Sequence, residues 1–176
     1  MTGISPFSEA PSYAAAQWCE LCGVRLAAAF RAPADEYAGL RNGVGLFDRS
    51  DRGLLTVTRA DRASWLNNLV TNAVKTLVDG AGTYAFATNV KGRILFDLNI
   101  LALPETLWLD LDLGAVASAA AHFDRHLVTE DVRITDASGQ YARLGCAGLG
   151  VATLAAQLGV KNINALAALA HVPVPD

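Results

Sequence analysis

The sequence predicts an α+β fold in which a ferredoxin-like antiparallel sheet carries two helices on one face. Two observations support this prediction. Every second residue along 94–100 and 107–111 is apolar, which is the period of strands that bury one face. Between Leu54 and Ile134 the segments follow the order strand, helix, strand, strand, strand, helix, strand. This order is typical of an antiparallel sheet that helices cover on one side.

Residues 82–101 give the clearest strand signal and are predicted to form a β-hairpin. The apolar set of the second strand, expected in the core, is Ile94, Phe96, Leu98 and Ile100. An even-numbered turn at residues 89–92 would place Tyr84 opposite Asp97 and so set a phenol against an acid. An odd loop with a bulge would instead shift the register by one residue and break this pairing.

The other face of this sheet is the candidate functional surface. It is predicted to carry Tyr84, Asp97, Asn99 and Trp108, because these residues alternate with the apolar sets of their strands. Aromatic and acidic side chains on an uncovered sheet face favour a ligand or a second domain as the partner.

The remaining segments are predicted from capping and breaking residues. Cys19 and Cys22 are expected one turn apart on an Ala-rich helix, as structural residues rather than a metal or redox pair. Asp61 is expected to cap a helix that ends at Thr71 and Asn72. His122 is expected on a solvated helix flank. The other expected helices are 13–21, 33–41, 115–127 and 151–158, and the other expected strands are 54–58, 131–134 and 141–146.

Composition limits the classes of function. With 176 residues, 52% hydrophobic and 18% charged, the chain is expected to fold around a sizeable core. A net charge of −3 argues against a nucleic-acid partner, because binding to phosphates normally needs a basic surface. No apolar run approaches the roughly 20 residues that span a bilayer, and no signal peptide is apparent. We therefore expect a cytoplasmic protein without a membrane partner, and the three cysteines fit a reducing compartment.

An ordered series of short motifs resembles the glycine-cleavage T-protein superfamily over about residues 13–158. The motifs are Glu36-Tyr37 with Leu40-Arg41, Gly43 to Asp48 with Ser50 and Gly53, Leu69 with Thr71 to Val74, Gly82 to Tyr84 with Asn89, and Gly92 with Ile94, Asp97 and Leu98. The resemblance implies tetrahydrofolate as the cofactor, bound in a central hole between three domains. It also implies either an aminomethyltransferase or a YgfZ-type protein that helps to mature iron–sulfur clusters.

Within this superfamily the chain is more similar to the YgfZ-type branch. T-proteins usually place a His where this chain has Asp51, and an acid pair where it has Phe96-Asp97. The resemblance assigns Asp97 the catalytic role of the acid that lies against the folate nitrogens, and Tyr84 the role of a folate-contacting tyrosine. Asn72, Asn99 and Trp108 are the further expected contacts, and no metal site is expected.

The resemblance also implies a domain division. Residues 1–52 and 137–176 are expected to be parts of a first, incomplete T-protein-like domain, and residues 53–136 to be the ferredoxin-like domain. The later Lys-Gly-Cys-Tyr-x-Gly-Gln-Glu signature of YgfZ-type proteins is absent. The resemblance implies a small-molecule folate as one partner. The absent signature implies a second partner, either another copy of the chain or a missing C-terminal half. A non-catalytic interaction module that has lost the ligand remains a third function.

Overall fold

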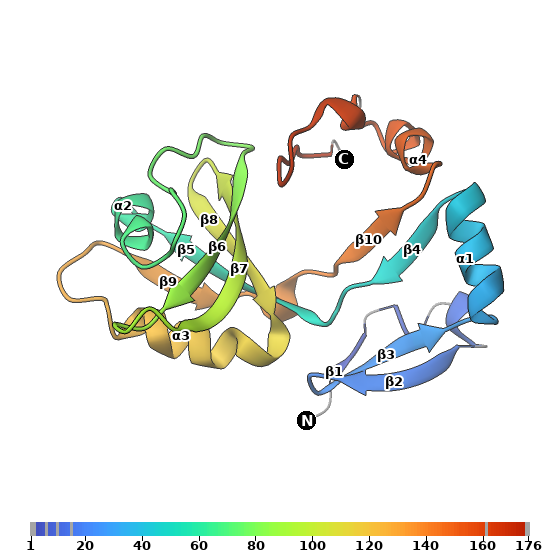
Figure 1. The fold of residues 1–176 in the computed structure, drawn as a ribbon, viewed down its shortest axis with the longest axis horizontal. Coiled ribbons are helices and arrows are strands. Elements are labelled where there is room, and N and C mark those ends of the chain that lie inside the picture. Colours follow the sequence, from blue (N-terminus) through green and yellow to red (C-terminus); the bar gives the residue numbers. More distant parts are fainter. Residues whose placement is uncertain (1–2, 6, 10, 15, 161, 175–176) are drawn as a thin grey trace. The chain divides into compact units, whose positions relative to one another are not determined.

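The computed structural model describes residues 3–5, 7–9, 11–14, 16–160 and 162–174 (Figure 1). The chain divides into two compact units. Unit 1 comprises Met1–Asp51, Ala142–Ala165 and Val174–Asp176, and unit 2 comprises Arg52–Tyr141 and Leu166–Pro173. Chain segments distant in the sequence therefore build each unit.

Unit 2 is a five-stranded antiparallel sheet with two helices on one face (Figure 1). Its strands are β5 (Arg52–Thr58), β6 (Gly82–Thr88), β7 (Ile94–Leu103), β8 (Thr106–Asp112) and β9 (Arg133–Asp136), in the order β6-β7-β8-β5-β9. The helices are α2 (Arg62–Asn67) and α3 (Val116–Asp124), with short 3₁₀ turns at Leu113–Ala115 and Ser138–Gln140. The predicted α+β fold is confirmed.

The core lies between the sheet and the two helices. Phe123 of α3 is fully buried, and its ring contacts the rings of Trp65 of α2 and Phe96 of β7 at 5.8 and 5.5 Å between centroids. The strands supply every second residue to this core, as their alternation predicts. The buried strand residues include Leu55, Val57, Ala85, Ala87, Leu98, Ile100, Leu107, Leu109 and Leu111.

The predicted register of the β6–β7 hairpin is wrong by two residues. Tyr84 lies opposite Asn99, and Phe86 lies opposite Asp97. A bulge interrupts the ladder between Ala87 and Thr88, so that the even, bulge-free turn assumed from the sequence does not form. A shift of two residues keeps each side chain on its face of the sheet.

One residue predicted to lie in the core is exposed at the bulged end of the hairpin. Ile94 begins β7 and is 60% exposed, although its period places it with the buried Phe96 and Leu98. It pairs with Thr88 at the irregular end of the hairpin, outside the core cluster of unit 2. The alternation therefore identifies the apolar face but not how far the core extends along it.

Unit 1 contains two small sheets. One has the order β1-β3-β2, formed by β1 (Gly3–Ile4), β2 (Gln17–Leu21) and β3 (Val24–Ala29). The other pairs β4 (Gly45–Asp48) with β10 (Leu144–Ala147) across about a hundred residues of chain. The helices are α1 (Pro33–Asn42) and α4 (Val151–Gln157), with 3₁₀ turns at Pro11–Tyr13 and Ile163–Ala165.

The helix predicted over residues 13–21 is wrong. Residue 15 lies outside the described residues, but residues 17–21 are strand β2, paired antiparallel with β3. The two strands join through Cys22 and Gly23, whose φ angles of 52° and 76° are those of a tight hairpin turn. Cys19 therefore lies on a strand and Cys22 in a turn. Cross-strand pairing overrides the helical preference of the nearby alanines.

Asp61 precedes α2 as predicted but does not cap it through its side chain. Its Oδ2 atom instead accepts a hydrogen bond of 2.8 Å from the backbone N–H of Asp131. The carboxylate thus holds the segment before β9 against the start of the helix. The helix ends at Asn67, earlier than the predicted stop at Thr71 and Asn72.

The predicted solvated position of His122 is also wrong. The residue is only 7% exposed, and its ring lies edge-on against Phe96 at 5.8 Å between centroids. Burial, the nearby His126 and then Arg125 lower the pKa of His122 below its ordinary value, because each disfavours the imidazolium form. At neutral pH this histidine is an uncharged core residue.

Acidification is expected to destabilise the fold through His122. The unfolded chain takes up the proton near pH 6.5, whereas the folded chain resists it until a lower pH. The contribution of His122 to stability is therefore present above about pH 6.5 and is lost as the pH falls through the lowered pKa. His122→Phe should flatten the dependence of the melting temperature on pH between about 5 and 7. A profile that still parallels the wild type would assign that dependence to other groups.

No helix in the described part of the chain is both long enough and apolar enough to cross a membrane.

Candidate functional site

The face of the sheet opposite α2 and α3, here called the far face, brings most of the predicted site residues together. Its middle row runs from Tyr84 of β6 through Asn99 of β7 to Asp110 of β8, which lie directly opposite one another. The next row pairs Leu101 of β7 with Trp108 of β8. Tyr84 is 45% exposed, and Asp97 is also exposed. The far face therefore presents aromatic and acidic groups at its surface.

Asp97 and Tyr84 interact across the β6–β7 pair. The Tyr84 hydroxyl donates a hydrogen bond of 3.0 Å to Oδ2 of Asp97, although the two residues are diagonal neighbours and not opposite ones. The hydrogen bond to Asp97 is the main cause that raises the pKa of Tyr84 above its ordinary value. The phenol therefore stays protonated at neutral pH, and it holds one oxygen of the carboxylate in place.

A second polar cluster joins three strands of the same face. The Nε atom of Arg52 donates a hydrogen bond of 2.9 Å to Oδ1 of Asp110, and Nη2 donates one of 3.1 Å to the backbone oxygen of Asp110. Oδ2 of the same carboxylate accepts a hydrogen bond of 3.1 Å from Nδ2 of Asn99. The Arg52 and Asp110 side chains are only 17% and 16% exposed. The pair is therefore shielded from solvent far more than an ordinary surface ion pair.

Sequence reasoning missed this cluster. Arg52 lies on β5 and bonds to Asp110, which is 58 residues further along the chain. The available signal was the position of Asp110 on β8, since it alternates with buried leucines and so lies on the same face as Trp108. The sequence does not show that β5 pairs with β8, and this pairing is what brings Arg52 to Asp110.

Asn72 lies beside the far face, next to the outer strand β6. Its Nδ2 atom donates to the backbone oxygen of Tyr84 at 3.1 Å, and its Oδ1 atom accepts from the N–H of Ala73 at 2.9 Å. The neighbouring Thr71 exchanges two hydrogen bonds with the backbone of Phe86. Residues 71 and 72 thus pair with the edge of β6, and both polar groups of the Asn72 side chain have hydrogen-bond partners.

Aromatic and apolar groups border the far face. The Trp108 ring packs on that of Tyr141 with 4.7 Å between centroids. The segment Leu166–Pro173 lies against the start of β6, where a Cβ atom on Gly82 would come within 2.6 Å of the backbone oxygen of Leu169. The backbone N–H of His171 donates to the oxygen of Gly80 at 2.9 Å, which holds this segment in place.

The far face has a defined chemical character. Oxygen acceptors dominate it, because Asp97 and Asp110 are carboxylates and their partners Tyr84, Asn99 and Arg52 donate to them. A planar ligand with several N–H groups suits such a surface, with Trp108 and Tyr84 available for contact with its rings. Among the described residues, no group of three or more His, Cys, Asp or Glu side chains is placed to hold a metal ion.

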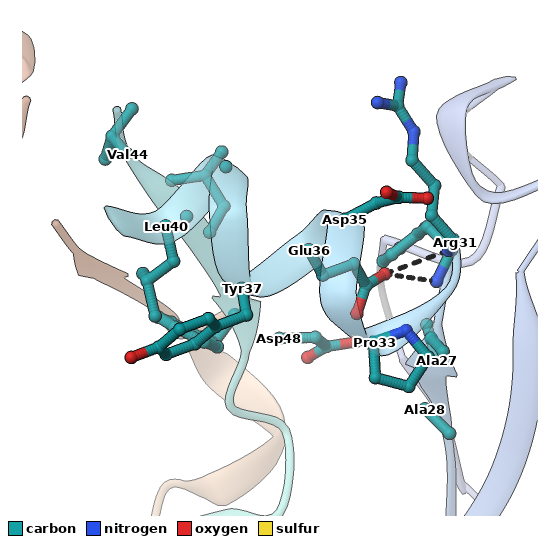
Figure 2. Close-up of a pocket in the computed structure, with 16 residues that line it drawn as sticks. Ala27, Ala28, Arg31, Pro33, Asp35, Glu36, Tyr37, Leu40, Val44 and Asp48 are labelled. Carbon is teal, nitrogen blue, oxygen red and sulfur yellow. Dashed lines mark hydrogen bonds between the residues drawn. The ribbon is translucent and has the colours of Figure 1, made fainter. Parts of the chain in front are cut away.

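Unit 1 contains a separate cavity of about 560 Å³ between β3, α1 and β4 (Figure 2). Its acidic groups serve local structure. Oε1 of Glu36 accepts from the backbone N–H of Phe30 and Arg31 at 2.6 and 3.0 Å. Oδ1 of Asp48 accepts from the N–H and hydroxyl of Ser50 at 3.0 and 2.7 Å, whereas its Oδ2 is buried with no partner among the described residues. None of the predicted site residues lines this cavity.

Comparison with known proteins finds a family model and relatives that agree with one another. Residues 7–168 match the family model described as the GCVT N-terminal domain. An aminomethyltransferase of Halalkalibacterium halodurans is 31% identical over 127 residues, which cover 72% of this chain and 34% of that protein. An aminomethyltransferase of Lysinibacillus sphaericus is 30% identical over 145 residues, which cover 81% of this chain and 39% of that protein.

A solved structure has the same fold. The crystal structure of glycine cleavage system aminomethyltransferase T from Bartonella henselae superimposes with a TM-score of 0.81 and 21% sequence identity, over 94% of this chain and 46% of that chain. At this identity the likeness establishes the fold alone. The chain thus spans about half the length of this structural neighbour.

Proposed function

We propose that this chain, which belongs to the family of the GCVT N-terminal domain, binds tetrahydrofolate on the far face of unit 2. The observation that carries the proposal is the hydrogen bond between Tyr84 and Asp97. These are the two residues that match the folate-contacting tyrosine and acid of the T-protein superfamily. Their meeting on one exposed face supports their common role.

Asp97 is the proposed catalytic group. The Tyr84 hydroxyl donates to Oδ2 of its carboxylate, and Oδ1 is the proposed acceptor for the ligand. A carboxylate beside a folate amine stabilises the positive charge that develops on nitrogen when a one-carbon unit moves. Bound tetrahydrofolate supplies the nitrogen that carries this unit. The residues of this chain bind and orient the ring, and Asp97 provides the compensating charge.

Asn99 and Trp108 are the proposed further contacts on the far face, and Asn72 the proposed contact at its edge. Trp108 is half-buried against Tyr141, so the ring is rigid and suited to stacking. Asn72 donates to the backbone oxygen of Tyr84, and this position beside Tyr84 would bring it against the edge of the bound ligand. We propose residues 53–136 as the ferredoxin-like domain that carries all of these groups, with 1–52 and 137–176 forming the other domain.

Two finer functions fit a folate-binding protein of this family. The YgfZ-type role in iron–sulfur cluster maturation is favoured by Asp51 and Phe96, which replace the His and the first acid usual in T-proteins. Aminomethyl transfer is favoured by the names of the relatives, both of which are aminomethyltransferases. Transfer of a one-carbon unit from an aminomethyl donor to tetrahydrofolate by the purified protein, with release of ammonia, would select the second role. Its absence with binding retained would favour the first.

Calorimetric titration of the purified chain with tetrahydrofolate, under anaerobic conditions, tests the proposed function. We expect saturable binding with one site per chain. A ligand held by one charge-assisted hydrogen bond and ring stacking should give a dissociation constant in roughly the micromolar range. Absence of heat at millimolar ligand would reject folate binding and favour a non-catalytic interaction module.

A further inference from the structure

The Asn99 side chain has only one orientation open to it on the far face. Its neighbour Asp110 is a carboxylate in an ion pair with Arg52, and an ionised carboxylate accepts hydrogen bonds but donates none. The amide group must therefore turn its NH₂ end toward Asp110, as the 3.1 Å contact from Nδ2 to Oδ2 records. The carbonyl oxygen of Asn99 consequently points away from Asp110.

This orientation places two acceptors side by side on β7. Oδ1 of Asp97 and the carbonyl oxygen of Asn99 belong to residues two apart on one strand, so their side chains leave the same face about 7 Å from each other. The side chains that hold both groups lie on other strands. Tyr84 of β6 fixes Asp97, and Asp110 of β8 fixes Asn99. The strand β7 therefore presents a preorganised pair of acceptors.

The chemistry of pterin rings gives this pair a discriminating function. In a tetrahydropterin, the two nitrogens of the reduced ring carry hydrogens and donate hydrogen bonds. In the fully oxidised ring the same nitrogens are bare and only accept. A face with two fixed acceptors binds the reduced form and leaves the oxidised form with acceptors opposed to acceptors, which penalises binding.

We propose that Asn99 is a specificity-determining residue that accepts an N–H of the reduced ring, and that Asp110 and Arg52 are positioning residues that fix its amide. The inference rests on the proposed binding of tetrahydrofolate and adds the basis of selection between its oxidation states. Arg52 acts through Asp110, since its two hydrogen bonds, to Oδ1 and to the backbone oxygen, hold the carboxylate in place.

The variant Asp110→Asn tests the proposal with little change in shape. The new amide oxygen can still accept from Nε of Arg52, which leaves the new NH₂ group facing Asn99. Asn99 must then turn its oxygen toward residue 110 and its NH₂ toward the ligand. Calorimetry with tetrahydrofolate and with folic acid, which share the same tail, isolates the contribution of the ring.

We expect the wild type to prefer tetrahydrofolate over folic acid by at least about tenfold, the value of one well-placed hydrogen bond. Asp110→Asn should reduce this ratio several-fold, and the remaining preference should come from the Asp97 acceptor. Asn99→Leu, which removes both polar groups of the side chain, should reduce the ratio to a similar extent. Asp124→Asn makes the same charge change on α3, within the helical layer, and should leave the ratio unchanged.

The outcomes separate the two proposals. One outcome is that the wild type binds tetrahydrofolate while Asp110→Asn and Asn99→Leu show the same preference for tetrahydrofolate over folic acid as the wild type. That result would overturn the role of Asn99 and leave the proposed function standing. A wild type that binds neither ligand would overturn the proposed function and this inference together. Circular dichroism of each variant confirms that a changed ratio does not come from a lost fold.

Discussion

Asp97→Asn is expected to weaken tetrahydrofolate binding by about one to two orders of magnitude. The substitution keeps the shape of the side chain and removes the charge that is proposed to face the ligand nitrogen. A charge-assisted hydrogen bond contributes roughly 1.5 to 3 kcal/mol, which corresponds to this loss of affinity. The Tyr84 hydroxyl can still donate to the amide oxygen of the variant, so the far face should keep its local structure. Calorimetric titration measures the change.

The fold should barely respond to this substitution, because Asp97 is exposed. Asp35→Asn is the matched control, since it removes one exposed carboxylate from the cavity of unit 1. It should leave the affinity for tetrahydrofolate unchanged. An unaltered affinity in Asp97→Asn, measured where the wild type binds, would show that the acid of the family has no such role in this chain.

Phe123→Ala is expected to lower the free energy of unfolding by about 3 to 5 kcal/mol. The ring is fully buried at the centre of the core and packs on Trp65, Phe96 and His122 at 5.5 to 5.8 Å between centroids. Its removal leaves a cavity between α3 and the sheet that these large neighbours can only partly fill. Such a loss is a large fraction of the stability of a domain of this size.

Urea denaturation followed by tryptophan fluorescence measures this effect, because Trp65 is part of the same cluster. Val128→Ala is the control, since Val128 is 84% exposed and its truncation should change stability by less than about 0.5 kcal/mol. Equal stabilities of the two variants would mean that α3 does not pack on the sheet as described.

The sheet of unit 2 could be predicted because each strand buries one face and exposes the other. The alternation of Leu107, Leu109 and Leu111 with Trp108, Asp110 and Asp112 predicts β8 without any knowledge of its neighbours. The register could not be predicted in the same way. It depends on the bulge beside Thr88, whose cause lies in backbone geometry and not in hydrophobic pattern.

The hairpin of β2 and β3 shows where local preference misleads. Alanines near residue 14 favour a helix, and the three-residue spacing of Cys19 and Cys22 fits one helical turn. The pairing of Leu21 with Val24 around the turn decides the structure instead. The dipeptide Cys22-Gly23 was the available signal, because a glycine in the second position favours such a turn.

The candidate site was predictable in its members on β6 and β7 and not in its partners from other strands. The two-residue alternation along the strands and the resemblance to the family together predict Tyr84, Asp97 and Asn99 as site residues. The ion pair of Arg52 with Asp110 depends on the pairing of β5 with β8, which joins residues far apart in the sequence. Long-range pairing of this kind is not encoded in any local pattern, so the cluster that orients Asn99 becomes visible only in the folded chain.

Ligand binding observed through the tryptophan indole signals tests most directly whether the far face is the folate site. The chain has three tryptophans, and they report on different places. Trp108 lies on the far face, Trp65 donates its indole N–H to the backbone oxygen of His126 within the core layer, and Trp18 lies on β2 of unit 1. In ¹H–¹⁵N spectra, tetrahydrofolate should shift the Trp108 indole signal and leave the other two in place. A shift confined to Trp18, or saturable binding that moves none of the three, would contradict the assignment of the folate site to the far face.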